Sequence, residues 1–183
     1  MSTLKVENIQ HTNGTNAIAI RSDGIITKNI IPMLKVGLSS AATISAGSGK
    51  VPFDSFNNSL VFDPEDNMSA FNTSTYTFTC PVAGKYFVYA KTTVLSSNTA
   101  REHQTYVYKN GSAILTNQLV FIGGTPIIND GSNFSGAQTS GIVNLAVNDT
   151  LQLYGKMNTT SGATFTFSSG IVHTTLGAYR IGA

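Results

Sequence analysis

The sequence predicts an all-β protein built as a sandwich or a jelly roll, and three observations lead to this prediction. Apolar and polar residues alternate with a period of two along the chain, and no window repeats with the 3.6-residue period of a helix. Thr, Ser, Asn and Gly number 23, 19, 16 and 17 of the 183 residues, and these types favour strands and turns. Turn signals separate the alternating runs at short intervals, which is typical of sandwiches and jelly rolls alike.

The first predicted element is a small β-hairpin near the N-terminus. Alternating runs at residues 16–21 and 25–28 flank Asp23-Gly24, and Asp-Gly between two such runs is a strong hairpin signal. An isolated two-stranded hairpin is only marginally stable in water. Residues 1–32 are therefore expected to form a separate β segment that folds against another surface.

The remaining strands are expected to form one domain, residues 33–183. Small residues dominate positions 39–49, which predicts a loop within the domain or a linker at its edge. Asn110-Gly111 separates two further runs and signals a second hairpin. The predicted strand runs are residues 76–80, 85–90, 105–109, 113–115, 141–147, 151–154, 164–167 and 178–181.

Alternation also sorts the aromatic residues between the two faces of each strand. Tyr86 and Phe87 are neighbours and must point to opposite faces, so we expect part of the aromatic set in the core and part exposed or in an interface. Cys80 is the lone cysteine, which excludes an intramolecular disulfide, and we expect it to pack in the core.

Composition excludes several classes of partner. The net charge is +2 and charged residues are 11% of the chain, against about 25% in typical proteins, so there is no basic field for nucleic acid. No stretch of about 18 apolar residues is present, so membrane insertion is not expected. The first residues hold no apolar block of a secretory signal, and we expect synthesis and assembly in a cytosol.

Catalytic motifs are missing from the sequence. The three histidines, His11, His103 and His173, are far apart and none has a metal-ligand spacing. No Gly-x-Ser-x-Gly motif occurs, and Gly123-Gly124 is not followed by the Gly-Lys-Ser/Thr of a phosphate loop. The chain is therefore expected not to be an enzyme and to need no cofactor.

One acidic cluster leaves two interpretations open. Its side chains supply carboxylate and amide oxygens, which Ca²⁺ prefers, but their spacing is not that of an EF-hand. The stretch is a calcium site or a solvated loop between strands. It comprises Asp63-Pro64-Glu65-Asp66-Asn67.

Residues 71–90 resemble the signature of the complement globular head and tumour necrosis factor-like (TNF-like) jelly rolls. The resemblance covers about residues 33–183, although Leu60, Val88 and Ala90 stand where that family usually has aromatics. It implies a ten-stranded jelly roll and a homotrimer with aromatic and aliphatic residues along a threefold axis. The residues that fall at the spacings of the signature are Asp66, Phe71, Phe78, Gly84 and Tyr86.

Residues 2–18 look like the amino-terminal segment of many bacteriophage tail proteins, especially those of marine phages. In such proteins a short attachment region precedes an exposed distal domain. The resemblance implies that residues 1–32 bind another virion protein or pair around a threefold axis. The side chains expected to be buried there are Ile9, Ile18, Ile20 and Ile26.

Together these observations predict a non-enzymatic virion protein, a trimeric tail fibre or spike whose head contacts a glycan or protein of the host surface. Two alternatives stay open: a capsid decoration or head-fibre protein, and a soluble carbohydrate- or calcium-dependent binding module. Loops on a rigid scaffold usually carry binding residues. The candidate ligand-binding residues are Asp63, Glu65, Asp66, Asn98, Arg101, Asn129, Asp130 and Asn133.

Overall fold

The computed structural model divides the chain into two compact units, Met1–Ile31 and Pro32–Ala183. Every strand pairing in the described part of the chain is antiparallel, and no membrane-crossing helix occurs there. The all-β prediction is confirmed. The structure describes residues 8–10, 16–20, 26–28, 31–44, 47–54, 65–96, 100–120, 133–159, 165–169 and 173–182.

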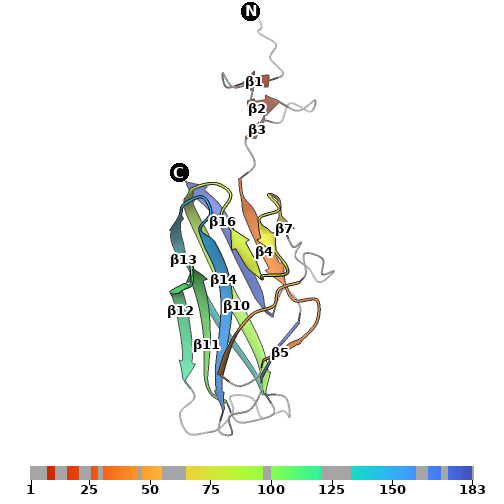
Figure 1. Cartoon of the computed structure of the whole chain (residues 1–183), viewed down its shortest axis with the longest axis vertical. Helices are drawn as coiled ribbons and strands as arrows, with labels where there is room; N and C mark the ends of the chain where they lie inside the picture. The colour runs from red at the N-terminus through yellow and green to blue at the C-terminus, as the bar shows by residue number, and fades with distance from the viewer. Residues whose placement is uncertain are drawn as a thin grey trace, which may run out of the picture. The chain divides into compact units, whose positions relative to one another are not determined.

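The N-terminal unit contains a three-stranded antiparallel sheet, β1-β2-β3, labelled in Figure 1. Its strands are β1 (Asn8–Gln10), β2 (Asn16–Ile20) and β3 (Ile26–Lys28). The pairing of β2 with β3 confirms the predicted hairpin, whereas β1 is a third strand that alternation did not indicate. The turn at Asp23-Gly24 lies outside the described residues.

The second unit, called the head below, has a seven-stranded sheet built around β10 (Gly84–Ser96). One edge of β10 pairs with β13 along its whole length, and the other edge pairs with β16 and then β15. β4 follows β16 and pairs with β7, while β5 follows β15. The other strands of this sheet are β4 (Met33–Gly37), β5 (Ala42–Ile44), β7 (Glu65–Asp66), β13 (Asn133–Leu145), β15 (Phe165–Phe167) and β16 (Thr175–Gly182).

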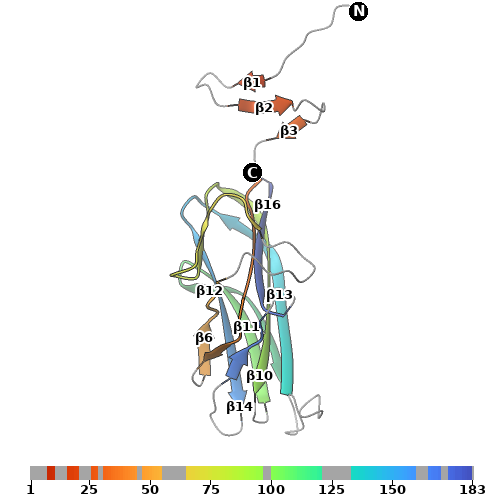
Figure 2. The ribbon, with the colours of Figure 1, turned by 90° about the vertical axis from the view of Figure 1, so that its right-hand side faces the viewer.

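A six-stranded sheet forms the other layer of the head. Its main path runs β12-β11-β14-β9-β8, and β6 pairs with β14. Figure 2, turned by 90° from Figure 1, shows β6 of this sheet and β13 of the other on opposite sides of the head. Its strands are β6 (Gly47–Lys50), β8 (Phe71–Asn72), β9 (Thr77–Thr79), β11 (Ala100–Lys109), β12 (Ser112–Val120) and β14 (Thr150–Thr159).

The core lies between the two sheets and is rich in aromatic rings. Tyr86 is fully buried, stacks edge-on against Phe78 at 6.3 Å, and donates a hydrogen bond to the Val82 carbonyl at 2.6 Å. Cys80 is also buried, as expected. Phe87 is 39% exposed on the opposite face, so the predicted separation of Tyr86 from Phe87 is confirmed. The other large side chains that are fully buried include Phe53, Phe165, Phe167, Leu34 and Leu151.

The hairpin at Asn110-Gly111 is confirmed in detail. Lys109 pairs with Ser112, which leaves a two-residue turn between β11 and β12. Both turn residues have positive φ, 50° at Asn110 and 81° at Gly111, as a type I′ turn requires. Asn and Gly tolerate this conformation better than other residues, and this preference explains why the sequence signal was strong.

Two local predictions were wrong. Tyr76 was expected in a strand, but it lies in a turn with φ 54°, and β9 begins only at Thr77. Residues 39–49 were expected to be a loop or linker, but they include β5 and part of β6, which belong to different sheets. Backbone pairing with β15 and β14 stabilises these small residues as strands, and the absence of a side chain lets Gly49 lie close against Ile44.

Candidate interaction surface

The outer face of the seven-stranded sheet carries three stacked aromatic rings. Phe87 and Tyr89 alternate along β10 and their ring centroids are 6.3 Å apart, with 26° between the planes. Tyr89 also stacks on Tyr179 of β16, with their ring centroids 5.7 Å apart and 21° between the ring planes. The two hydroxyl groups lie 3.1 Å apart and share a hydrogen bond.

The register of the sheet explains why these rings meet. Tyr179 pairs with Phe87, and Gly177 pairs with Tyr89, so the position opposite the Tyr89 ring has no side chain. A Cβ atom at Gly177 would overlap that ring. Burial and the hydrogen bond to Tyr179 raise the pKa of the Tyr89 hydroxyl well above its ordinary value, so this hydroxyl stays neutral at physiological pH.

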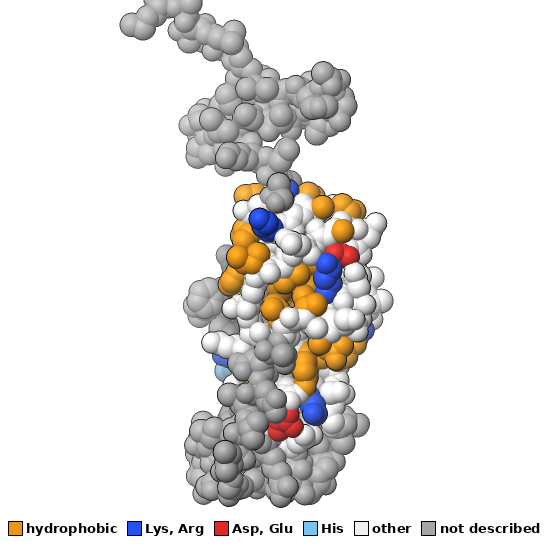
Figure 3. Space-filling view, turned by 90° about the vertical axis from the view of Figure 1, so that its left-hand side faces the viewer, with side chains coloured by type: hydrophobic (Ala, Val, Ile, Leu, Met, Phe, Trp, Pro, Cys, Tyr) orange, Lys and Arg blue, Asp and Glu red, His pale blue; other side chains and the backbone are white. Residues whose placement is uncertain are grey.

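Aliphatic side chains extend the aromatic cluster to the edge of the sheet. Ile142 of β13 pairs with Phe87 and is 66% exposed, and Ile181, two residues after Tyr179, is 55% exposed. We call Phe87, Tyr89, Ile142 and Tyr179 the aromatic face. Exposed apolar groups gathered on one surface indicate an interaction site. Figure 3 views the molecule from the left-hand side of Figure 1. On this side of the head, hydrophobic side chains are exposed in several places and charged side chains are few.

A hollow of about 480 Å³ adjoins the aromatic face. Its lining combines aromatic rings with amide, hydroxyl and ammonium groups. This mixture suits a side chain of a protein partner that has both apolar and polar parts. The lining residues include Phe87, Tyr89, Lys91, Gln138, Ser140 and Thr175.

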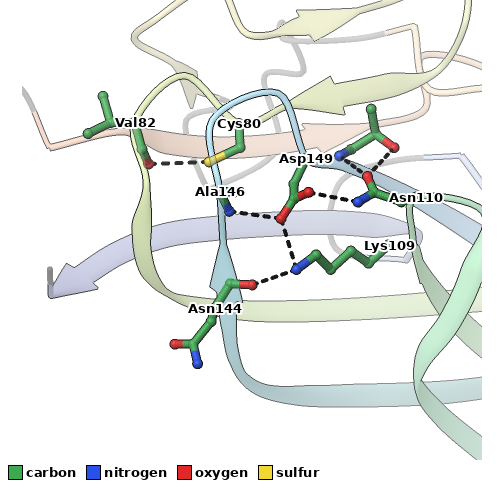
Figure 4. Close-up of polar contacts among 8 residues, drawn as sticks. Cys80, Val82, Lys109, Asn110, Asn144, Ala146 and Asp149 are labelled. Carbon is green, nitrogen blue, oxygen red and sulfur yellow. Dashed lines mark hydrogen bonds and ion pairs between the residues drawn. The ribbon is translucent and has the colours of Figure 1, made fainter.

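A group of polar side chains at one end of the head stabilises the fold by joining two turns (Figure 4). Lys109 Nζ lies 2.8 Å from Asp149 Oδ2, and Asn110 Nδ2 donates to Asp149 Oδ1 at 2.7 Å. The amide of Ala146 donates to the same carboxylate at 2.8 Å. The hydrogen bond from Lys109, followed by those from Asn110 and Ala146, lowers the pKa of Asp149 to about 2. This carboxylate therefore ties the β11–β12 turn to the segment between β13 and β14.

Asp66 is the predicted ligand residue whose contacts are clearest. Its Oδ1 accepts a hydrogen bond from the amide of Ala70 at 2.8 Å, and its Oδ2 accepts one from the amide of Phe71 at 2.9 Å. Both oxygens therefore hold the turn before β8. Among the described residues no group of three or more His, Cys, Asp or Glu side chains is placed to hold a metal.

The other predicted ligand residues do not gather around Asp66. Asp66 pairs with Leu34 at the start of β4, whereas Asn133 pairs with Ser96 at the far end of β10. Because β10 and β4 both run antiparallel to β16, these positions lie at opposite ends of the head. Glu65 lies in β7 and Arg101 near the start of β11. Those outside the described residues are Asp63, Asn98, Asn129 and Asp130. Ligand binding by this set stays a prediction.

The predicted attachment residues all lie in strands of the N-terminal unit. Ile9 of β1 pairs with Ile18 of β2, and Ile20 of β2 pairs with Ile26 of β3. These pairs place four isoleucines in neighbouring strands of one small sheet. Their role in virion attachment stays a prediction.

Sequence reasoning missed Tyr179 and Ile142 as parts of the surface. Alternation already placed Phe87 and Tyr89 on one face, but Tyr179 lies 90 residues from Tyr89 in the chain. Only the pairing of β10 with β16 and β13 brings these residues together. No signal within a single strand could have indicated the full cluster.

Similarity to known proteins is confined to the fold. No family model matches the chain, and no curated protein matches it. The structure of Eiger TNF from S. frugiperda is similar, with a TM-score of 0.58 and 10% identity over 82% of this chain and 92% of that chain. Murine APRIL, crystallised at pH 5.0, has a TM-score of 0.55 and 10% identity over 83% of this chain and 100% of that chain.

These likenesses show that the chain has a TNF-like jelly-roll fold. The fold implied by the resemblance at residues 71–90 is thus confirmed. The structural neighbours give no indication of a phage origin.

Proposed function

We propose that the chain is a non-enzymatic binding module that works as a homotrimer, with the aromatic face buried between copies. The observation that carries this proposal is the exposed aromatic face on a TNF-like jelly roll. The sequence resemblance implies a trimer with aromatic and aliphatic residues along its axis, and the aromatic face supplies such residues. A cyclic trimer uses the same interface three times, so one apolar face is enough to close the assembly.

The energetics favour burial of this face. Phe87 and Ile142 are 39% and 66% exposed in the single chain. Burying the exposed part of one such side chain in an interface stabilises that interface by about 1–2 kcal/mol. The stacked rings already hold one another, so little side-chain entropy is lost on association.

A role without catalysis is supported by the titratable groups. His103 is fully buried in the core, where its Nε2 lies 2.8 Å from Thr92 Oγ1. Asp149 is held by Lys109 and Asn110 at the end of the head. Neither group lines the hollow beside the aromatic face.

The oligomeric state tests the proposal directly. Native mass spectrometry at 10 µM should show a trimer, and Ile142→Asp should convert it to a folded monomer, because three carboxylates cannot be buried at an apolar interface. Ile114→Asp is the matched control, since Ile114 is a similarly sized exposed residue on the other sheet. A monomeric parent protein, or a trimer that Ile142→Asp leaves intact, would contradict the proposal.

We further propose that this trimer is a phage tail fibre or spike, anchored by residues 1–32, whose head contacts the host surface. The similarity of residues 2–18 to tail-protein segments supports this role, as does a separate small unit ahead of the head. The weakly charged surface suits recognition through hydroxyl and amide groups.

Immunogold labelling of virus particles with antibody against residues 33–183 tests this finer role. Label on tail fibres is the expected result, followed by competition of the purified trimer with phage adsorption. Label spread over the capsid would instead support a decoration or head-fibre protein. Particles without label would leave the soluble binding module as the remaining alternative.

A further inference from the structure

A second aromatic group lies on the outer face of the six-stranded sheet. Tyr106 and Tyr108 alternate along β11, with ring centroids 6.2 Å apart and 69° between their planes. Tyr108 also contacts Tyr154 of β14, with their ring centroids 4.5 Å apart and 42° between the ring planes. All three rings are half-buried. We call Tyr106, Tyr108 and Tyr154 the tyrosine platform.

The platform rests on a well-packed part of the head. Tyr106 pairs with Tyr154, and the next pair along, Val107 with Leu153, points inward and is fully buried. Rings that stand on such a backbone keep their spacing, and a preorganised surface loses little entropy on binding. Tyr108 pairs with Gln152, so an amide side chain lies beside the rings.

Hydrogen-bonding groups surround the platform. Lys50 pairs with Tyr154 on the side of β6, and Gln152 Nε2 donates to Thr77 Oγ1 at 2.7 Å. On the other side Glu102 lies 3.8 Å from Lys156 Nζ and accepts hydrogen bonds from the side chains of Gln104 and Asn158. Lys50 and Lys156 against Glu102 leave only a small net positive charge around the platform, so the surroundings do not require a charged ligand.

Gln104 gives a second, independent observation. Its side chain is only 7% exposed, and its Oε1 has no hydrogen-bond partner among the described residues. It pairs with Lys156, in the row next to Tyr106 and Tyr154. A buried acceptor without a partner is unfavourable. A ligand hydroxyl placed beside Gln104 would supply a donor for this oxygen.

We propose that the tyrosine platform binds a neutral pyranose oligosaccharide. The C–H face of a pyranose ring is apolar and stacks on tyrosine, while its hydroxyls need the amide, ammonium and carboxylate groups that surround the platform. This inference rests on the proposed function of surface recognition and names its ligand class and its face. The two outer faces of a sandwich point in opposite directions, so a trimer that buries the aromatic face leaves the platform exposed.

Titration of the full-length protein with maltohexaose, cellohexaose and chitohexaose tests the inference. The chain has no tryptophan, so intrinsic fluorescence reports its seven tyrosines directly. At least one probe should bind with a millimolar or lower Kd and change this fluorescence. Absence of binding by all three at 10 mM, in fluorescence and in calorimetry, would overturn the proposal.

Matched variants locate the binding. Tyr154→Ala and Tyr106→Ala should weaken binding at least tenfold, whereas Tyr154→Phe keeps the ring and should stay within threefold of the parent. Tyr179→Phe, on the aromatic face, should leave saccharide affinity unchanged. Circular dichroism and native mass must match the parent for each variant that is compared. If both alanine variants keep the parent's affinity, the saccharide binds elsewhere, and the assignment of the site to the tyrosine platform is refuted.

The result also separates this inference from the proposed function. If no probe binds but the trimer still blocks phage adsorption, the saccharide inference fails and surface recognition stands with another ligand. If binding depends on the platform but particles carry no label, the saccharide site stands on a soluble module.

Discussion

Gly177 shows how one missing side chain shapes a surface. It lies opposite Tyr89, and a Cβ atom there would overlap the Tyr89 ring. We expect Gly177→Ala to push that ring outward and to break its hydrogen bond with Tyr179. The ring can swing toward solvent, so the free energy of unfolding should fall by only about 1–2 kcal/mol. Association should weaken at least tenfold in native mass titrations.

A matched glycine substitution controls for the loss of backbone flexibility. A Cβ at Gly136 in β13 meets only Thr93 Oγ1, at 3.7 Å, so Gly136→Ala should leave both stability and association nearly unchanged. Equal effects of the two substitutions would show that the Tyr89 ring does not depend on the space above Gly177.

His103 makes stability depend on pH. Burial lowers the pKa of this histidine from 6.5 to about 4. Above pH 6.5 the histidine is neutral in both the folded and unfolded states and has no effect. Between pH 6.5 and 4 the unfolded state binds the proton first, so the free energy of unfolding falls, by about 3 kcal/mol in total.

Urea denaturation at fixed protein concentration from pH 7.5 to 4 measures this loss. His103→Gln should remove most of the pH dependence in that range, although the variant starts less stable because the packing changes. Asp149 does not interfere, because its pKa of about 2 confines its loss of stabilisation to pH values below about 4. An unchanged slope in the variant would refute the assignment to His103.

The turn between β11 and β12 illustrates how one element depends on its residue choice. Asn110 has φ 50°, and its Oδ1 accepts a hydrogen bond from the amide of Thr150 at 2.8 Å. Its Nδ2 donates to Asp149. Asn110→Ala loses both hydrogen bonds and strains the backbone, so we expect a loss of about 2–3 kcal/mol in free energy of unfolding.

Asn110→Gly separates the two contributions. It loses the hydrogen bonds but accepts the positive φ, so it should lose about 1 kcal/mol less than Asn110→Ala. Chemical denaturation of the two variants measures the difference. Equal losses would mean that the backbone conformation at this position carries no strain.

For the whole molecule, the two units differ in their capacity to fold alone. The described core of the head lies within residues 34–178, and the N-terminal unit has only 31 residues. Chains shorter than about 40 residues rarely fold without help. We expect residues 32–183 to keep a Tm within about 5 °C of the full chain, whereas a peptide of residues 1–31 should be unfolded in circular dichroism.

A cooperative thermal transition in the monomeric peptide would contradict this expectation, as would a large drop in Tm on removing residues 1–31. Full-length Ile142→Asp adds a further check. If assembly of the head brings the N-terminal segments together, this variant should increase proteolysis within residues 1–31 relative to Ile114→Asp.

Much of the fold could be predicted because period-two alternation and turn chemistry are local. The strand around Tyr86 and Phe87 and the turn at Asn110-Gly111 followed from neighbouring residues alone. The short strands β5 and β6 could not be predicted, since pairing with distant strands stabilises small residues that favour loops. Tyr76 was assigned to a strand because alternation does not reveal a positive φ.

The sequence by itself determined the fold class, the buried and exposed sides of individual strands, and the absence of recognisable catalytic motifs. Tertiary structure alone decided which exposed residues share a surface. Tyr89 meets Tyr179, and Tyr108 meets Tyr154, only through cross-strand register. The physical reason is that alternation depends on adjacent residues, whereas register depends on how all strands together bury one core.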